Sequence, residues 1–309
     1  MPNRVANSEQ RSSVDLKLAI SVVILTRNDD ASIAAVLQSC KFSDDIHLCD
    51  HLSIDQTVKL ARQESSSIQV HSVSDCDTRH RGAIISSLAT RYQWVLLLNG
   101  NERVPSALQS EFLDTLGLFG TRGKAAGYTM TAQTHFMGRT LKHASVGYPP
   151  EIRLFHRQRC IPNWPLAPQA ASSIYHFHRL KHHLLTEEFS HGLKEWFVKV
   201  NSVKTPEGGI STPMCPSADE IPRTTNPRLA TMYRRTSDML TQPIRGRSLI
   251  RFLDMYLWRF GWLDGSPGFH YCAMISMYEY WTEMKMRERH VDWIGKTTRL
   301  AQRLSQERA

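Results

Sequence analysis

The chain has 309 residues, of which 41% are hydrophobic and 22% charged, and its formal net charge at pH 7 is +9. Such values are typical of a globular protein, and the length fits one large domain with an appendage or two modest domains. No stretch reaches the roughly 18 apolar residues that a spanning helix requires, and the N-terminus is polar. The sequence therefore predicts a protein that is neither exported nor membrane-spanning.

The first half of the chain alternates short β-branched runs with helical patterns, which is the signature of βαβ units around a mainly parallel sheet. After a predicted disordered tail at residues 1–17, we expect strands at 19–26, 46–49, 68–73 and 94–98, and helices at 31–42, 57–63 and 81–93. This order predicts an α/β fold in which ligands bind beyond the carboxyl ends of the strands.

Regularity drops after residue 125, where we expect strands at 126–132 and 151–157 and a proline-rich surface loop at 204–228. Helices at 248–262 and 269–290 follow, both rich in aromatic residues. Aromatic side chains at helical spacing usually form core. The sequence therefore predicts a main domain at 18–203 and a helical C-terminal region at 229–309.

The excess positive charge lies mostly after residue 150, and such a surface suits nucleic acid, anionic lipid or phosphorylated substrates. Nothing besides net charge favours nucleic acid, so no nucleic-acid partner is expected. The helix at 248–262 resembles an interfacial membrane element, which predicts peripheral contact with an anionic membrane. Its aromatic residues are interleaved with arginines at 245, 247, 251 and 259.

Cysteine and histidine usage gives little support for a metal centre. The six cysteines form no CxxC pair, so neither a disulfide framework nor a zinc knuckle is indicated, and a reducing, cytosolic setting is expected. Four histidines crowd the segment YHFHRLKHH at 175–183, but no cysteine or acidic residue sits at ligand spacing. We interpret this segment as a solvated basic stretch.

Five motifs lie in a characteristic order: TRNDD at 26–30, DHLSIDQT at 50–57, NGNERV at 99–104, RLF at 153–155 and RFGWLDGSPG at 259–268. Together they resemble the family 2 glycosyltransferases with the GT-A fold, and most closely the bacterial enzymes that add a sugar to the lipopolysaccharide inner core. The resemblance covers about residues 18–288. It implies a mainly parallel, Rossmann-like sheet flanked by helices, with a helical C-terminal extension.

The resemblance also implies a nucleotide-sugar donor and a set of binding residues. Asp50 and Asp55 would accept hydrogen bonds from the base or ribose, and a second interpretation is that both carboxylates cap the helix that begins near Gln56. The predicted nucleotide-sugar-binding residues are Thr26, Asn28, Asp50, Asp55, Asn99 and Arg153.

Several acidic positions of the family pattern are changed in this chain. Asn99 and Asn101 stand where the family has the two aspartates of its metal loop, and an amide is a weaker ligand for Mn²⁺ or Mg²⁺ than a carboxylate. Asn101 and Glu102 are the remaining metal candidates, so cation binding is expected to be weak or absent. Because two prolines replace the family's proline-aspartate before RLF, Glu151 is the nearest candidate for the catalytic base.

Two functional hypotheses remain open from the sequence. The first is an inverting glycosyltransferase of the hexosyltransferase type. It would be cytoplasmic and peripheral at the inner face of the cytoplasmic membrane, and would transfer a sugar to a lipopolysaccharide-core or other cell-envelope glycan, including a lipid-linked one. The second is a catalytically inactive homologue that binds a nucleotide-sugar, a glycan or a partner enzyme, since fold does not guarantee activity.

Overall fold

A computed structural model describes residues 17–73, 81–116, 124–144, 150–161, 169–170, 174–202 and 247–290. The chain separates into two compact units. The first unit holds Met1–Thr129, Ile152–Pro162 and Pro168–His182, and the second holds Met130–Glu151, Asn163–Ala167 and His183–Ala309. The predicted N-terminal tail, apart from Lys17, and the predicted loop at 204–228 lie outside the described residues.

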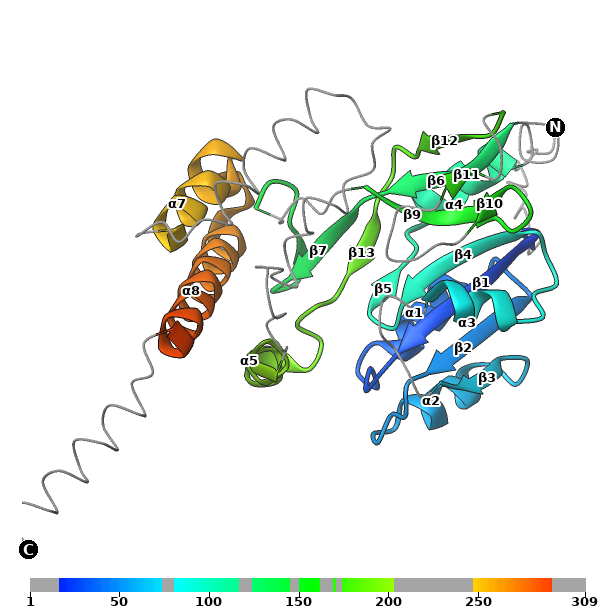
Figure 1. Cartoon of the computed structure of the whole chain (residues 1–309), viewed down its shortest axis with the longest axis horizontal. Helices are drawn as coiled ribbons and strands as arrows, with labels where there is room; N and C mark the ends of the chain where they lie inside the picture. Colours follow the sequence, from blue (N-terminus) through cyan, green and yellow to red (C-terminus); the bar gives the residue numbers. More distant parts are fainter. Residues whose placement is uncertain are drawn as a thin grey trace, which may run out of the picture. The chain divides into compact units, whose positions relative to one another are not determined.

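The first unit is built on a seven-stranded sheet in the order β12-β6-β9-β4-β1-β2-β3 (Figure 1). Pairing is parallel between β1 and β2, β1 and β4, β2 and β3, and β12 and β6, whereas β9 runs antiparallel to β4. The strands are β1 (Ile20–Thr26), β2 (Asp45–Asp50), β3 (Gln69–Ser72), β4 (Trp94–Asn99), β6 (Ala125–Met130), β9 (Glu151–His156) and β12 (His176–Arg179).

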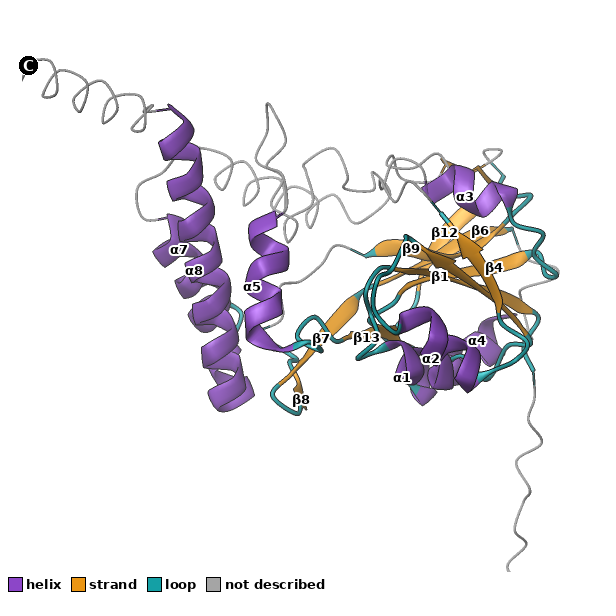
Figure 2. Cartoon of the chain, turned by 90° about the horizontal axis from the view of Figure 1, so that it is seen from below, coloured by secondary structure: helices purple, strands orange, loops and turns teal. Residues whose placement is uncertain are grey.

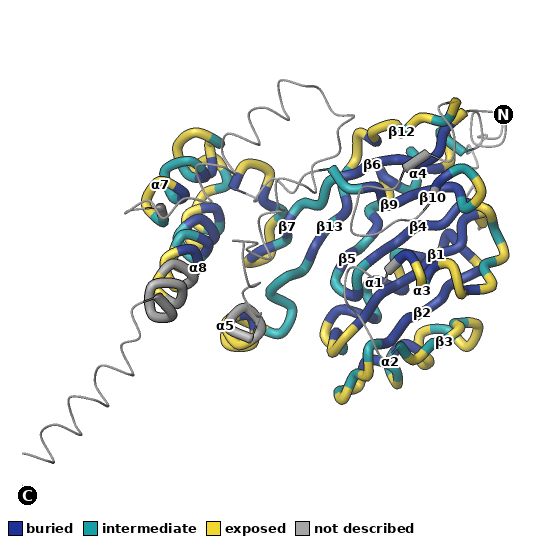
Figure 3. Tube along the Cα trace, in the orientation of Figure 1, coloured by how far each residue is buried: buried dark blue, intermediate teal, exposed yellow. Residues whose placement is uncertain are grey.

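The centre of this sheet is apolar and its edges are polar. Every residue of β1 is buried, as is nearly all of β4, because continuous runs of Val, Ile and Leu suit strands that are covered on both faces (Figure 3). The edge strands β3 and β12 are each four residues long, with the sequences QVHS and HFHR, and are mostly exposed or half-buried.

Four helices cover the sheet: α1 (Ile33–Ser39), α2 (Thr57–Glu64), α3 (Arg81–Ser87) and α4 (Ser106–Thr115). Figure 2 shows α1, α2 and α4 on one face and α3 on the other. The prediction of a helix over 81–93 is wrong at its end. The amide of Arg91 donates to Asp45 and that of Tyr92 to Ser21, so this segment's backbone bonds to the sheet and does not extend the helix.

The second unit combines short strands with helices. Strand β7 (Ala132–Phe136) pairs with β8 (Arg139–Thr140) as an antiparallel hairpin and with β13 (Leu184–Thr186) in parallel. Its helices are α5 (Gly192–Ser202), α7 (Arg247–Leu253) and α8 (Gly265–His290), with a π-helical turn η4 (Asp254–Trp258) and a 3-10 turn η5 (Gly261–Asp264) between the last two. Smaller strands elsewhere are β5 (Glu102–Arg103), β10 (Cys160–Ile161) and β11 (Gln169–Ala170).

The predicted single helix at 248–262 is interrupted in the structure. The chain turns at Phe260, whose φ of +59° lies in the left-handed region and ends the preceding helix. A Cβ at Gly261 would lie 2.6 Å from the carbonyl oxygen of Met255, so only glycine permits this return. The following helix begins at Gly265, before the predicted residue 269.

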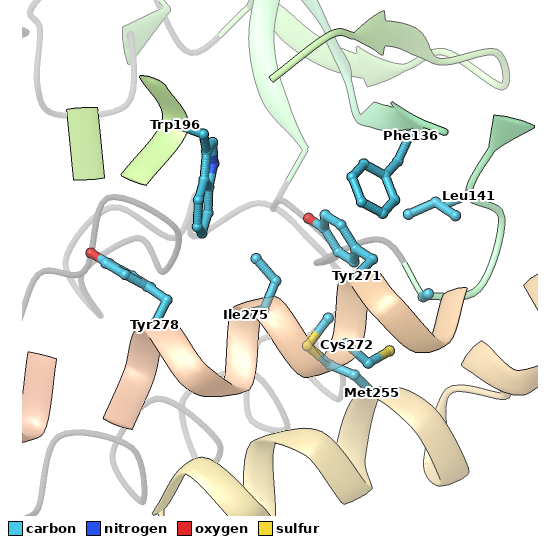
Figure 4. Packing of buried hydrophobic residues seen from close by; sticks show 9 residues of the cluster. Phe136, Leu141, Trp196, Met255, Tyr271, Cys272, Ile275 and Tyr278 are labelled. Atoms are coloured by element: carbon cyan, nitrogen blue, oxygen red, sulfur yellow. The ribbon is translucent and has the colours of Figure 1, made fainter. Parts of the chain in front are cut away.

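An aromatic cluster forms the core of the second unit (Figure 4). Trp196 of α5 and Tyr271, Ile275 and Tyr278 of α8 pack there with Phe136 of β7. This cluster confirms that aromatic residues of the C-terminal helices serve as core. The α/β class, the mainly parallel sheet flanked by helices and the helical C-terminal extension are also confirmed. No described helix is long and apolar enough to cross a membrane.

Candidate functional site

Strand order singles out one edge of the sheet. From β1 the chain proceeds to β2 and β3 on one side, whereas β4 joins β1 on the other side (Figure 1). In open α/β sheets, ligands bind outside the carboxyl ends of the strands at such a reversal. The loops that follow β1, β2 and β4 meet there.

The loops after β1 and β2 are joined through Ser53. The amide of Asn28 donates to the Ser53 hydroxyl oxygen at 2.9 Å, and that hydroxyl donates to Asp50 Oδ1 at 2.5 Å. The Ser53 amide donates to the other Asp50 oxygen at 3.1 Å, and the Ile54 amide donates to Asn28 Oδ1 at 2.9 Å. The predicted residues Asn28 and Asp50 therefore belong to one connected network.

Asp55 forms a second connection between the same loops. Its Oδ1 accepts from the Thr57 amide at 3.0 Å and the Thr57 hydroxyl at 2.6 Å, and its Oδ2 accepts from the Asp30 amide at 3.1 Å. Burial acts to raise the pKa of Asp55, but these hydrogen bonds outweigh it and hold the pKa below its usual value. Asp55 thus satisfies the first amide of α2, as the capping interpretation expects, whereas the bonds of Asp50 lie within its own loop.

The two loops also hold unusual backbone conformations. Asn28 and Leu52 have φ values of +53° and +49°, which cost non-glycine residues free energy and cluster at functional sites. Ile54 is 93% exposed beside them. Arg27 is also exposed, and its guanidinium makes no hydrogen bond or ion pair with the described residues. An apolar side chain and an available cation therefore flank the network.

The end of β4 packs directly on the end of β1. The Gly100 amide donates to the Leu25 carbonyl oxygen at 2.8 Å, and a Cβ at Gly100 would lie 2.2 Å from Asp29 Oδ2. That same oxygen accepts from the Thr26 hydroxyl at 2.8 Å. Thr26 is buried, so this predicted binding residue stabilises the end of β1. Any side chain at position 100 would displace the Asp29 carboxylate from this contact.

Asn99 and Asn101 are the half-buried amides on either side of Gly100. Within the described part of the chain their side chains make no hydrogen bond, although the Asn99 backbone amide donates to Glu102 Oε2 at 2.9 Å. An amide side chain offers both an acceptor and two donors. These two groups are chemically available at the edge where β4 ends.

Glu102 and Arg153 bond to each other. Arg153 Nη2 lies 3.0 Å from Glu102 Oε1 and Nη1 lies 3.2 Å from Oε2, and both side chains are buried. Glu102 is the one carboxylate of the predicted metal loop, and Arg153 neutralises its charge in this bidentate pair. Arg153, predicted to bind the nucleotide-sugar, is thereby engaged with Glu102. No group of three or more His, Cys, Asp or Glu side chains among the described residues is arranged to hold a metal ion. The one carboxylate of the predicted metal loop is therefore already paired with a cation.

The predicted base, Glu151, is the half-buried first residue of β9. Since β9 runs antiparallel to β4, it begins at the edge of the sheet where β4 ends. The histidine-rich segment disperses. His176 and His178 lie on the exposed edge strand β12, and His182 Nδ1 lies 2.9 Å from Glu111 Oε2 in the first unit. His183 contacts the Thr131 hydroxyl in the second unit.

Four residues of this network were not singled out from the sequence. Asp29 was present in the quoted TRNDD motif, and a carboxylate three residues after a strand-end threonine is a signal for a local turn. Ser53 and Gly100 also lie inside quoted motifs. Arg27 became distinctive only because its guanidinium is exposed and without a partner among the described residues.

No protein-family model matches the sequence, and no curated protein matches it. Among solved structures, Staphylococcus aureus TarS is similar with 13% identity and a TM-score of 0.36, covering 59% of this chain and 63% of that one. A cytidylyltransferase from Leptospira borgpetersenii shows 13% identity and a TM-score of 0.32, covering 46% of this chain and 61% of that one.

Glucosyl-3-phosphoglycerate synthase from Mycobacterium tuberculosis, solved with Mn²⁺, UDP and phosphoglyceric acid, shows 18% identity and a TM-score of 0.32. The match covers 52% of this chain and 67% of the synthase. The chain thus spans less than two thirds of the TarS and cytidylyltransferase structures.

Proposed function

We propose that the chain binds a nucleotide-sugar beyond the carboxyl ends of β1, β2 and β4 and transfers the sugar to a glycan acceptor, as a glycosyltransferase of the GT-A class. The observation that carries the proposal is the interlocked network of Asn28, Asp50, Ser53 and Asp55 at the reversal of strand order. Such pre-organised polar loops at that edge suit a nucleotide. The main domain at 18–203 would be the donor-binding domain.

Each part of the edge has a proposed role. Asp50 and Asp55 hold the loop that presents Ile54, whose exposed side chain would contact the base. The amides of Asn99 and Asn101, which have no hydrogen-bond partner among the described residues, would bind ribose or phosphate oxygens. The guanidinium of Arg27 would meet the diphosphate, because arginine matches phosphate geometry.

Transfer without a divalent cation requires another positive group to offset the charge of the departing diphosphate. Arg27 is exposed at the end of β1 and would supply that charge, whereas Arg153 is bonded to Glu102. Glu151 would take the acceptor's proton. Any binding of Mn²⁺ or Mg²⁺ would be weak.

The acceptor is proposed to be a lipopolysaccharide-core or other cell-envelope glycan, including a lipid-linked one, at the inner face of the cytoplasmic membrane. This acceptor class follows from the sequence resemblance to enzymes of the lipopolysaccharide inner core. The protein would then work in the cytoplasm as a peripheral membrane protein.

A second candidate function is nucleotide-sugar or glycan binding without turnover. The buried pair of Glu102 and Arg153 favours it, because this pair removes the loop's carboxylate from catalysis. Under this alternative the loops after β1 and β2 keep their binding role while transfer is absent.

Calorimetry with UDP, GDP and their sugars tests the binding step. We expect binding with or without EDTA, and Arg27→Gln should weaken UDP binding about tenfold while leaving uridine binding unchanged, since only the diphosphate carries charge. Arg62→Gln on the exposed face of α2 is the matched control. Absence of binding at millimolar nucleotide would refute the site.

A product assay then separates transfer from binding. If the chain is a transferase, Glu151→Gln should abolish product formation at unchanged nucleotide affinity. A wild type that binds but never forms product with any tested glycan acceptor supports the second candidate. The double change Asn99→Asp and Asn101→Asp should raise Mn²⁺ affinity in the presence of nucleotide, because it adds two carboxylates to the loop.

A further inference from the structure

The second unit exposes a run of large apolar side chains in residues 257–263, which we call the aromatic turn. Trp258 is 78% exposed, and Phe260 and Trp262 are 54% and 51% exposed. Leu257 and Leu263 are exposed as well. Soluble proteins rarely show large contiguous apolar patches unless these meet a partner or a membrane.

The aromatic turn is held by its backbone. The amide of Phe260 donates to the Leu257 carbonyl oxygen at 3.2 Å, and that of Leu263 donates to the Phe260 carbonyl oxygen at 2.9 Å. Gly261 is buried against Met255 and Cys272. The exposed side chains therefore project from a fixed turn, and their exposure is a property of the fold.

Two of the arginines predicted to make this region basic, Arg251 and Arg259, are already engaged within the fold. Arg251 is only 4% exposed, and Arg259 lies 3.1 Å from Asp254 in an ion pair. Arg245 lies outside the described residues. The predicted basic face of a helix over 248–262 is therefore wrong for Arg251 and Arg259, because packing and pairing use both.

A different segment brings positive charge to the aromatic turn. Asp264, the last residue of η5, accepts hydrogen bonds from the backbone amides of Lys142, His143 and Ala144 at 3.1, 2.8 and 2.7 Å. A Cβ at Gly265 would lie 3.7 Å from Arg139 Nη1. Asp264 thus fastens residues 139–143, which we call the basic turn, beside the aromatic turn.

The basic turn presents its basic side chains to solvent. Arg139, Lys142 and His143 are all exposed. Arg139 and Lys142 form no side-chain ion pair within the described part of the chain, and the Asp264 carboxylate is occupied by three amides. The neighbouring carboxylate therefore leaves these cations available to an external anionic partner.

We propose that the aromatic and basic turns together form a docking surface for an anionic lipid bilayer. The inference deepens the peripheral-membrane part of the proposed function and rests on it, but it needs no property of the nucleotide site. Tryptophan and phenylalanine settle at the level of lipid headgroups, and adjacent Lys and Arg gain from anionic lipids. Apolar rings beside exposed cations match this chemistry better than they match a second copy of the same positive surface, which would bring like charges together.

Flotation of the full chain with vesicles of phosphatidylcholine alone, or with 30% phosphatidylglycerol, tests the surface. We expect binding to the anionic vesicles only, reversed by 0.5 M salt. Arg139→Gln with Lys142→Gln should weaken binding about 30-fold, at roughly one kcal/mol per charge. Trp258→Ser with Trp262→Ser should weaken it at least about tenfold on the same vesicles.

Matched controls lie in the first unit. Lys59→Gln with Arg62→Gln removes the same charge from the exposed face of α2 and should leave vesicle binding within about twofold. Equal loss in this control would show that net charge, not the basic turn, drives binding, and would overturn the proposal. So would equal binding to neutral vesicles.

Light scattering of the tryptophan variant addresses self-association. A wild-type dimer that becomes monomeric in Trp258→Ser with Trp262→Ser, without vesicle binding by either protein, would assign the surface to a second copy and overturn the proposal. UDP calorimetry on the same variants should be unchanged. A lost nucleotide site with retained flotation would contradict only the transferase proposal.

Discussion

Both units bury charged side chains, but they differ in the surface that they expose. In the first unit the apolar strands are buried, and the loops after β1 and β2 expose Leu52 and Ile54 among polar groups that are mostly bonded to one another. In the second unit Arg251 and Glu279 are buried, while Trp258 and Trp262 are exposed. The first arrangement suits the binding of a polar ligand from water, and the second suits a surface that binds to an apolar phase.

The largest effect expected from breaking this contrast lies at Arg153. Arg153→Met leaves the buried carboxylate of Glu102 without its bidentate partner, which should lower the free energy of unfolding by about 3 to 5 kcal/mol. The double change Glu102→Leu with Arg153→Met should recover most of that loss, because it removes both charges of the pair. Urea titration of the three proteins measures it, and equal stability of wild type and Arg153→Met would show that the pair is open in solution.

A smaller loss is expected at the contact between β1 and β4. Gly100→Ala places a methyl group 2.2 Å from Asp29 Oδ2, so the Asp29 side chain or the loop must move. Overpacking of this kind typically costs about 1 to 3 kcal/mol. Adding Asp29→Ser should relieve the clash, so the double variant should have a higher Tm in thermal melts than Gly100→Ala alone. If Gly100→Ala melts like the wild type, the close approach does not exist.

The core of the first unit should also respond to acid through His156. Burial, and secondarily the charge of Arg159, lowers the pKa of His156 from 6.5 to about 4. The unfolded chain therefore binds a proton at a higher pH than the folded chain does. Stability is fully present above pH 6.5 and is lost as the pH falls toward 4.

His156→Phe should remove the part of the acid-induced loss of stability that comes from His156. The wild type should lose about 1 to 2 kcal/mol between those pH values, less than the full pKa difference implies because solvent reaches part of the ring. The variant should show a flatter profile in urea titrations across the same range. An unchanged slope would assign the acid response to other groups, such as His71, whose pKa is also lowered by burial and by the charge of His47.

The smallest effect is expected on the exposed face of the second unit. Trp258→Ser should change the free energy of unfolding by no more than about 0.5 kcal/mol, since folding buries little of the Trp258 side chain. The matched control is Trp196→Ala, because Trp196 is buried in the aromatic cluster and its truncation should cost about 3 kcal/mol or more. Similar losses in both would mean that the aromatic turn is packed in solution.

Local pattern predicted six of the seven strands of the large sheet, all but β12, and the buried faces of the first helices. The buried positions Ile33, Val36 and Leu37 of α1 follow directly from helical periodicity. Helix ends were less predictable. The predicted helix at 81–93 ends early because the backbone amides of Arg91 and Tyr92 donate to side chains of the sheet. The predicted helix at 248–262 ends early because the chain turns at Phe260, next to the buried Gly261.

The position of the candidate site could be predicted from the sequence, but the side chains that pair with each other there could not. The motifs located the edge of the sheet where the loops after β1, β2 and β4 meet, because strand ends follow from the βαβ pattern. The pairing of Glu102 with Arg153 joins residues 51 positions apart, and no local pattern specifies which carboxylate a buried arginine chooses. The placement of Lys142 and His143 on Asp264, 122 and 121 positions away, is likewise set only by tertiary packing.

The short polar edges of the large sheet have a consequence for how copies of the chain meet. An unpaired edge strand offers backbone donors and acceptors to any further strand, and long, flat apolar edges promote aggregation. Strands β3 and β12 are the two edge strands of the sheet, and each is four residues long. Strand β3 contains His71, and β12 contains His176, His178 and Arg179. Strand addition there would gain few ladder bonds and would bring basic side chains together, so this sheet disfavours growth into larger assemblies or fibrils.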